Sequence, residues 1–272
     1  MEAFELIVGN SNRRFSGVTA SMLSSLPCVS RHLKLVVLGG RFVPDSIPTI
    51  NYKDFIRLCQ KALPCGKTRV FHARRNNEMI QALIAKKFFG AKLRIVFTST
   101  AQRSHSWLTC YLISQMDGII STCKAAASYL EEPPDTIIPH GVNTEMYHPA
   151  PCKIEAWKAL GYPGKYGIGI FGRVRYQKGV DLFVKAAILV AAKYPSFTFL
   201  IGGEITPSNQ AFVKSLQLQV QEAGMKDRIL FIGKQPIERL PVLFRSVSAV
   251  AALVLQQPQR PFVAWCAGAF GD

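Results

Sequence analysis

The stretch YGIGIFGRVRYQKGVDLFVKAAILVAAKYP, residues 166–195, contains a strand, a turn and a helix in direct succession. Its first six residues, 166–171, form a short apolar run of the kind that buried parallel strands show. From Val180 the apolar residues recur at helical spacing until Pro195 ends the pattern. The turn between them holds Gly172 and three cations. This arrangement predicts a parallel α/β sheet with a basic turn at the carboxyl end of one strand.

The same alternation continues on both sides of this stretch. It predicts strands at 4–9, 33–40, 68–73, 93–100, 117–123, 166–172, 197–203 and 227–233. It predicts helices at 16–29, 51–63, 76–90, 124–130, 179–195, 208–224 and 237–247. We therefore expect an α/β protein of two tandem doubly wound Rossmann-like domains, with ligands in a cleft between them.

The expected domain bounds follow from breaks in this pattern. We predict a first domain at 1–143 and a second at 144–250, entered through a proline-rich, helix-poor segment around Pro149, Pro151 and Pro163. Residues 251–272 show neither strand nor helix periodicity, so we expect an irregular tail.

The charge of the chain favours anionic partners. Its 272 residues include 33 Lys and Arg against 17 Asp and Glu, a net charge of +16. Such an excess fits phosphates, nucleic acid or an acidic membrane surface, and a scattered surface excess is the plain alternative. The longest apolar run near the end is far too short for a membrane span, and no signal peptide is evident. Seven cysteines without a C-x-x-C pair predict reduced thiols in the cytosol.

The basic turn suits a diphosphate. Arg173 and Lys178 lie five residues apart where a helix begins. The Arg guanidinium can donate two hydrogen bonds to a diphosphate, while the Lys ammonium and the helix dipole add positive charge beside it. A solvated basic turn remains the alternative. The chain has no Walker motif, no G-x-G-x-x-G after its first strand and no D-x-D, so neither a nicotinamide cofactor nor a metal–diphosphate clamp is expected.

Several segments resemble one enzyme family. FGRVRYQKGVDLFVKA (171–186) resembles the G-R-x-x-x-x-K-G signature of the family-4 retaining glycosyltransferases, which have the two-Rossmann GT-B architecture. IPHGVNTEMYHP (138–149), FLIGGE (199–204) and NRRFSGVTASM (12–22) resemble further segments of that family. With FHARRNNEM (71–79) and VFTSTAQRSHS (96–106), the chain is most similar to lipopolysaccharide core mannosyltransferases of alpha-proteobacteria.

The resemblance implies a function. It implies transfer of a hexose, mannose from GDP-mannose, to a lipid-linked lipopolysaccharide core acceptor with retention of configuration. It implies no cofactor or metal beyond the nucleotide-sugar donor, and no nucleic-acid partner. It also implies a cytoplasmic enzyme held peripherally on the anionic inner face of the plasma membrane.

The resemblance also implies site residues. The implied catalytic residues are Arg173, Lys178 and His105. His72 is added as a catalytic candidate because it ends a predicted strand before a loop with two Arg and two Asn, and a structural histidine is the alternative. The implied substrate-binding residues are Ser16, Gly17, Gln102, His140, Gly141, Asn143, Gly172, Gly203 and Glu204. The implied basic patch, for acceptor or membrane, consists of Arg74, Arg75, Lys86 and Lys87, within a segment where Glu78 is the single acid among nine cations.

One motif of the family is missing from this chain. The family has an E-x7-E motif after the position where this chain reads SVSAV (246–250), and neither acid is present here. We therefore expect a truncated, incomplete second domain, an out-of-frame tail from near Val250 and an uncovered apolar face or edge on the second sheet. Two alternatives stay open: an inactive remnant that at most binds nucleotide sugar, and a basic phosphate- or nucleic-acid-binding α/β protein.

Overall fold

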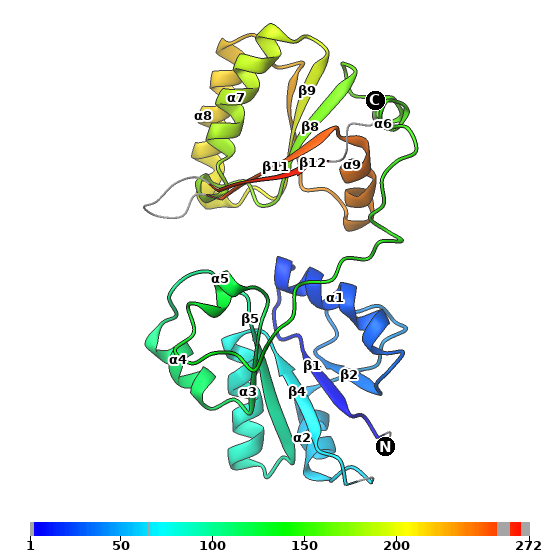
Figure 1. Ribbon diagram of the computed structural model, residues 1–272, viewed down its shortest axis with the longest axis vertical. Helices are drawn as coiled ribbons and strands as arrows, with labels where there is room; N and C mark the ends of the chain where they lie inside the picture. The colour runs from blue at the N-terminus through cyan, green and yellow to red at the C-terminus, as the bar shows by residue number, and fades with distance from the viewer. Residues whose placement is uncertain (1–2, 65, 255–261, 268–272) are drawn as a thin grey trace. The chain divides into compact units, whose positions relative to one another are not determined.

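The computed structural model describes residues 3–64, 66–254 and 262–267. The chain divides into two compact units, Met1–Val142 and Asn143–Asp272 (Figure 1). Among the described residues, no helix combines the length and the apolar character needed to cross a membrane.

The first unit contains one parallel sheet. Its strands are β1 (Leu6–Gly9), β2 (Leu35–Leu38), β3 (Thr49–Ile50), β4 (Arg69–Ala73), β5 (Leu93–Ser99), β6 (Gly118–Ser121) and β7 (Thr136–Ile137), in the order β3-β2-β1-β4-β5-β6-β7. Its helices are α1 (Gly17–Val29), α2 (Tyr52–Gln60), α3 (Asn76–Phe88), α4 (Trp107–Ser114) and α5 (Lys124–Ala127).

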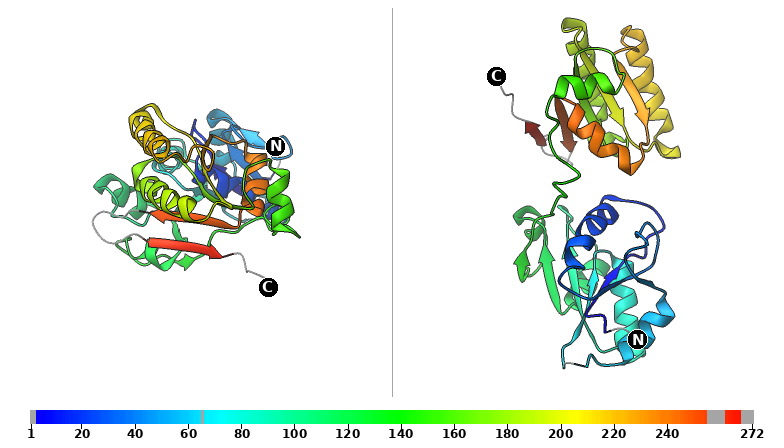
Figure 2. Two further views of the ribbon diagram at one scale, coloured as in Figure 1. Left: turned by 90° about the horizontal axis from the view of Figure 1, so that it is seen from above. Right: turned by 90° about the vertical axis from the view of Figure 1, so that its right-hand side faces the viewer.

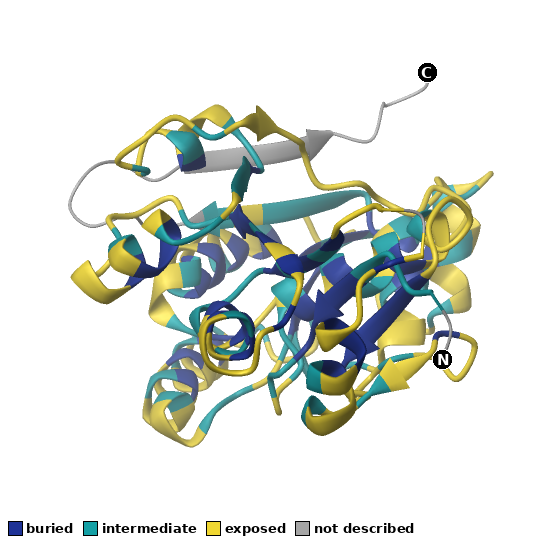
Figure 3. Ribbon diagram, turned by 90° about the horizontal axis from the view of Figure 1, so that it is seen from below, coloured by how far each residue is buried: buried dark blue, intermediate teal, exposed yellow. Residues whose placement is uncertain are grey.

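Both faces of this sheet are buried under helices. Ile7 and Val36 pack with residues of α2 and α3, while Val8 and Val37 pack with residues of α1. Successive side chains of a strand point to opposite faces, so these neighbours reach two different cores. The central strands are accordingly coloured as buried in Figure 3. This two-sided burial explains why the strands are continuous apolar runs.

The strand order fixes where a ligand site can form in the first unit. From β1 the chain proceeds to β2 and β3 on one side and then returns to place β4 on the other. The loops after β1 and β4 therefore diverge at the carboxyl edge of the sheet, which is the place where open α/β sheets bind ligands.

The second unit repeats the design. Its strands are β8 (Tyr166–Phe171), β9 (Phe197–Gly202), β10 (Ile229–Gly233), β11 (Ala249–Val254) and β12 (Phe262–Ala267), in the order β10-β9-β8-β11-β12. All described neighbours are parallel except β12, which is antiparallel to β11 (Figure 2). Its helices are α6 (Lys153–Ala159), α7 (Val180–Lys193), α8 (Gln210–Glu222) and α9 (Leu240–Ser246). Short 3-10 turns, η1 (Tyr176–Lys178), η2 (Pro207–Asn209) and η3 (Ile237–Arg239), precede the last three helices. The switch point of this sheet lies between β8 and β11.

The structure corrects the expectation of an uncovered apolar face. Helices α7 and α8 lie on one side of the second sheet, and α6 and α9 lie on the other (Figure 1). Trp157 of α6 and Leu243 of α9 are buried with Leu200 of β9. The faces of β8, β9 and β10 are therefore covered on both sides.

Three further expectations were wrong. The segment after Pro151 was expected to be poor in helix, yet it forms α6, because the prolines fall on either side of 153–159 rather than within it. No helix was predicted at 107–114, which forms α4 behind the N-cap of Ser106. The tail was expected to be irregular from residue 251, yet β11 extends to Val254 and 262–267 form β12. Residues 255–261 and 268–272 of that tail lie outside the described residues.

Candidate functional site

The loop after β8 lies in close backbone contact with the loop after β9. Gly172 has a φ of 142° and Gly203 a φ of 156°. A Cβ atom on Gly203 would lie 1.6 Å from the carbonyl oxygen of Gly172, so only glycine fits there. The amide of Gly172 donates to Gly202 O (2.9 Å), and the amide of Val174 donates to Glu204 O (3.0 Å). The two strand ends thus form one continuous backbone surface at the carboxyl edge.

The charged side chains stand on this backbone surface. Arg173 Nε lies 3.9 Å from a carboxylate oxygen of Glu204, and both side chains are about half exposed. Lys178 ends the η1 turn, and within the described residues its ammonium group has no ion-pair partner. Gly179 follows with a φ of 63° and starts α7. Of the implied residues, Gly172, Arg173, Gly203 and Glu204 therefore lie together, and Lys178 lies on the same loop, immediately before the N-terminus of α7.

A second cluster occupies the switch point of the first unit. Arg75 donates through Nη1 to Glu78 Oε1 (2.9 Å) and through Nη2 to the hydroxyls of Ser16 (3.0 Å) and Thr19 (2.9 Å). Glu78 is fully buried, and its Oε2 accepts from the amide of Arg74 (2.8 Å). Burial raises the pKa of Glu78, and the Arg74 amide and the Arg75 guanidinium oppose that rise. This network ties the start of α1 to the end of β4.

Gly17 is the first residue of α1, next to this network, and its surroundings are open. Ser16 caps the helix, since its hydroxyl accepts from the amide of Thr19. Gly17 is exposed, and no atom lies within 4 Å of the place where its Cβ would stand. The protein itself therefore gives no steric reason for glycine at position 17.

His72 lies on β4 beside a threonine of the next strand. Its Nε2 lies 2.7 Å from Thr98 Oγ1. Burial, with a contribution from the positive charge of Arg74, lowers the pKa of His72 to about 3. The imidazole is therefore neutral at physiological pH, so it acts as a hydrogen-bonding group and not as a proton donor.

A polar cavity of about 490 Å³ opens at the carboxyl end of β5. Its lining includes Arg74, Asn76, Thr98, Arg103, His105 and Thr109. His105 Nε2 lies 3.5 Å from Ser99 Oγ, and burial together with Arg103 lowers the pKa of His105. Gln102 is exposed nearby in the chain, and its amide donates to Cys123 Sγ (3.5 Å). The structure thus brings His105 and Arg74 to one cavity.

The implied residues of the segment that joins the two units are all exposed. His140 and Gly141 are exposed. Asn143 is also exposed, and its side-chain oxygen accepts from the amides of Glu145 (3.0 Å) and Met146 (3.1 Å). Asn143 therefore stabilises a turn, and its role toward a substrate stays a prediction, as do those of His140 and Gly141.

The four cations of the expected basic patch lie in two groups along α3. Arg74 and Arg75 precede α3, whereas Lys86 and Lys87 lie in its last turn, more than ten residues or about 16 Å along the helix. Arg75 is engaged with buried Glu78, and Lys86 pairs with Asp117 at 2.7 Å. Lys87 donates to the Gln115 side chain (2.9 Å). The four cations thus form two separate groups, and three of them already have side-chain partners.

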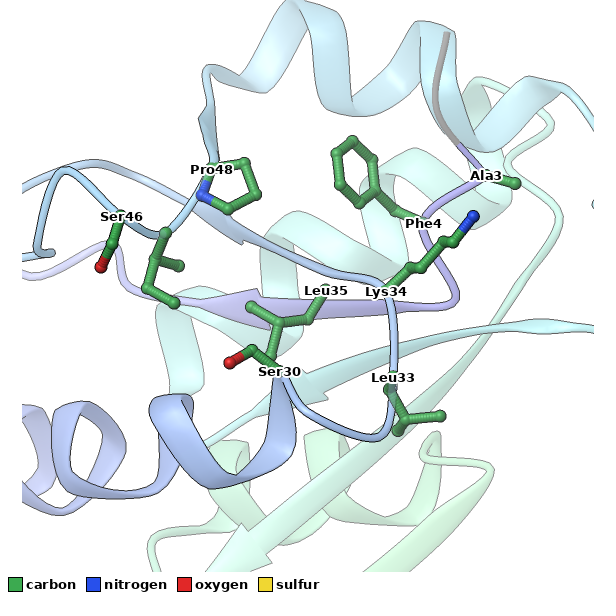
Figure 4. Close-up of a pocket in the computed structure, with 9 residues that line it drawn as sticks. Ala3, Phe4, Ser30, Leu33, Lys34, Leu35, Ser46 and Pro48 are labelled. Atoms are coloured by element: carbon green, nitrogen blue, oxygen red, sulfur yellow. The ribbon is translucent and has the colours of Figure 1, made fainter.

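Another pocket of the first unit lies at the edge of the sheet opposite to the Arg75–Glu78 cluster. Phe4, Lys34, Leu35, Ile47 and Pro48 contribute to its lining, at the amino ends of β1 and β2 (Figure 4). Ligand sites of open α/β sheets form at the opposite edge. This pocket is therefore not part of the candidate site.

Sequence reasoning missed Glu78, Asn76, Thr98 and Thr109. Only Glu78 carried a signal in the sequence. It is the single acid among nine cations, and an acid in such surroundings is expected to pair with one of them. Among the described residues, no group of three or more His, Cys, Asp or Glu side chains is arranged to hold a metal ion.

A family model and two curated mannosyltransferases match this chain. The family model described as glycosyl transferases group 1 matches residues 155–258. The lipopolysaccharide core biosynthesis mannosyltransferase LpsB of Rhizobium meliloti is 40% identical over 261 residues, which cover 94% of this chain and 71% of LpsB. The corresponding protein LpcC of Rhizobium leguminosarum is 38% identical over 233 residues, which cover 85% of this chain and 65% of LpcC. The chain thus spans about two thirds of the length of these relatives.

Solved structures agree on the fold. The structure of Anabaena Alr3699/HepE in complex with UDP and glucose matches with a TM-score of 0.72 and 16% identity, over 92% of this chain and 74% of that one. Sucrose-phosphate synthase of Thermosynechococcus elongatus matches with a TM-score of 0.62 and 15% identity, over 90% and 74% of the two chains. The fold is the GT-B fold predicted from the sequence.

Proposed function

We propose, since the chain belongs to the group 1 glycosyltransferase family, that it transfers mannose from GDP-mannose to a lipopolysaccharide core acceptor with retention of configuration. The names of LpsB and LpcC support mannose as the sugar and the lipopolysaccharide core as the acceptor. The acceptor class in turn supports work at the inner face of the plasma membrane.

One observation carries the proposal: the backbone surface formed by Gly172 and Gly203, with Arg173 and Lys178 beside it. A diphosphate needs close backbone approach and fixed positive charge, and both are present here. When the bond to the sugar breaks, negative charge develops on the leaving nucleotide. A guanidinium and an ammonium held in place would stabilise that charge without reorganisation.

Residues of the first unit have supporting roles in this proposal. Gly17 leaves open space beside Ser16, which a substrate group can occupy. His72 and His105 act as neutral hydrogen-bonding groups on the acceptor side, because burial lowers the pKa of each. Gln102, His140, Gly141, Asn143 and Glu204 complete the proposed substrate contacts.

A transfer assay tests the proposal. The purified chain is incubated with GDP-mannose and a core acceptor that lacks its outer sugars, and NMR of the product gives the anomeric configuration. We expect α-mannosyl product from GDP-mannose and none from UDP-glucose. Arg173→Ala and Lys178→Ala should abolish transfer, while Lys185→Ala, an exposed lysine of α7, should not. Product of inverted configuration, or full activity of Lys178→Ala, would contradict the proposal.

A further inference from the structure

The cavity at the carboxyl end of β5 has a lining suited to an anion. Arg74, Arg103 and His105 contribute to it, together with hydroxyl and amide groups, and neither Asp nor Glu is among its lining residues. A cavity whose charged lining residues are all basic favours an anion.

Arg74 is the least satisfied of these groups. Its Nη1 atom is buried, and within the described residues it has no hydrogen-bond partner. The nearest acid, Glu78, already accepts from Arg75 Nη1 and from the Arg74 amide. Both oxygens of Glu78 are therefore engaged by other groups, and among the described residues no hydrogen bond joins this carboxylate to the Arg74 guanidinium. A buried donor without a partner is costly, so such a group points to a ligand that supplies the acceptor.

Two helices begin at the same cavity. Asn76 is the first residue of α3, and its amide donates to the hydroxyl of Thr109 in α4 (2.8 Å). Ser106, the N-cap of α4, also lines the cavity. The positive ends of both helix dipoles therefore lie beside Arg74, and each favours negative charge near it.

We propose that this cavity binds a carboxylate or phosphate group carried by a saccharide, with Arg74 as the principal donor and Arg103 at the entrance. If the proposed function holds, this saccharide is the acceptor, which is then selected by its acidic substituent. A planar guanidinium can donate two parallel hydrogen bonds to either group. The residues that line this cavity belong to the first unit, whereas Arg173 and Lys178 belong to the second.

Calorimetric titration of the whole chain tests the proposal. The probes are the methyl glycoside of glucuronic acid, mannose 6-phosphate and neutral methyl glucoside. We expect one acidic sugar to bind saturably, which identifies carboxylate or phosphate as the source, and the neutral sugar to bind at least tenfold more weakly. Arg74→Gln should weaken the acidic sugar by about tenfold or more. Failure of both acidic sugars to bind a folded chain would overturn the proposal.

Matched variants separate this site from others. Arg94→Gln removes the same charge at the amino end of β5, so it should leave binding of the acidic sugar unchanged. Arg103→Gln, at an exposed position, gives a second loss of binding without a risk to folding. Arg74→Gln should also keep the thermal midpoint of the wild type. A fall in that midpoint, or equal binding by Arg74→Gln and Arg94→Gln, would show that Arg74 is structural.

The outcome is independent of the proposed function. Binding of an acidic sugar without mannosyl transfer would remove the proposed function and keep the anion site. Transfer to a core acceptor by a chain that binds no acidic sugar would remove the anion site alone.

Discussion

Replacing Gly203 by alanine tests the backbone contact at the centre of the second unit. The new Cβ would lie 1.6 Å from the oxygen of Gly172, so the two loops must separate by about 1.4 Å to reach the 3.0 Å below which such contacts are essentially absent. The φ of 156° adds a strain of roughly 1–3 kcal/mol. Repacking around the extra methyl group adds roughly another 1–3 kcal/mol.

We therefore expect Gly203→Ala to lower the free energy of unfolding by roughly 2–6 kcal/mol and the thermal midpoint by roughly 4–24 °C. Circular dichroism during heating measures the midpoint. Gly224→Ala is the control, because Gly224 also has a positive φ (68°) but no atom within 4 Å of its would-be Cβ. Equal midpoints for the two variants would refute the role given to the Gly172–Gly203 contact.

Three other predictions concern the first unit. Gly17→Ala should keep or raise stability by up to about 1 kcal/mol while it impairs mannosyl transfer, because only a bound substrate would meet the methyl group; unimpaired transfer would remove Gly17 from the site. Glu78→Gln should cost about 3–5 kcal/mol in denaturant unfolding, because the Arg75 guanidinium, whose side chain is only 16% exposed, loses its buried carboxylate, and a loss under 1 kcal/mol would contradict that role. Because the pKa of His72 is lower in the folded chain than in the unfolded one, the unfolded chain binds more protons between pH 6.5 and about 3. Stability should therefore fall as the pH drops below 6.5, and His72→Gln should reduce that fall, as thermal midpoints at pH 7.5 and 5 would show.

The positions of the main strands and helices could be predicted because their patterns are strong. The run YGIGIF and the helical spacing after Val180 appear in the structure as β8 and α7, and the helix predicted at 16–29 appears as α1. Helix α4 was missed because its exposed face carries Trp107, Leu108 and Tyr111, which removes the polar face that marks an amphipathic helix.

The partners of the basic residues could not be predicted, because pairing depends on tertiary contacts. Nine cations between Lys67 and Arg103 suggested a charged surface. In the structure Arg75 faces inward to Glu78, Ser16 and Thr19, and Ser16 lies 59 positions away from it in the sequence, so only the tertiary fold brings these groups together. The sequence placed Arg173 and Glu204 after neighbouring strands, so their proximity was predictable from parallel strand order.

The most direct test of the central claim is a calorimetric titration of the purified chain with GDP-mannose, with UDP-glucose as the control nucleotide sugar. If the loop of Arg173 and Lys178 holds the donor diphosphate, GDP-mannose binds saturably, Lys178→Ala weakens it by about tenfold or more and Lys185→Ala does not. Absence of GDP-mannose binding by a folded chain, or equal affinity of Lys178→Ala and wild type, would contradict the account.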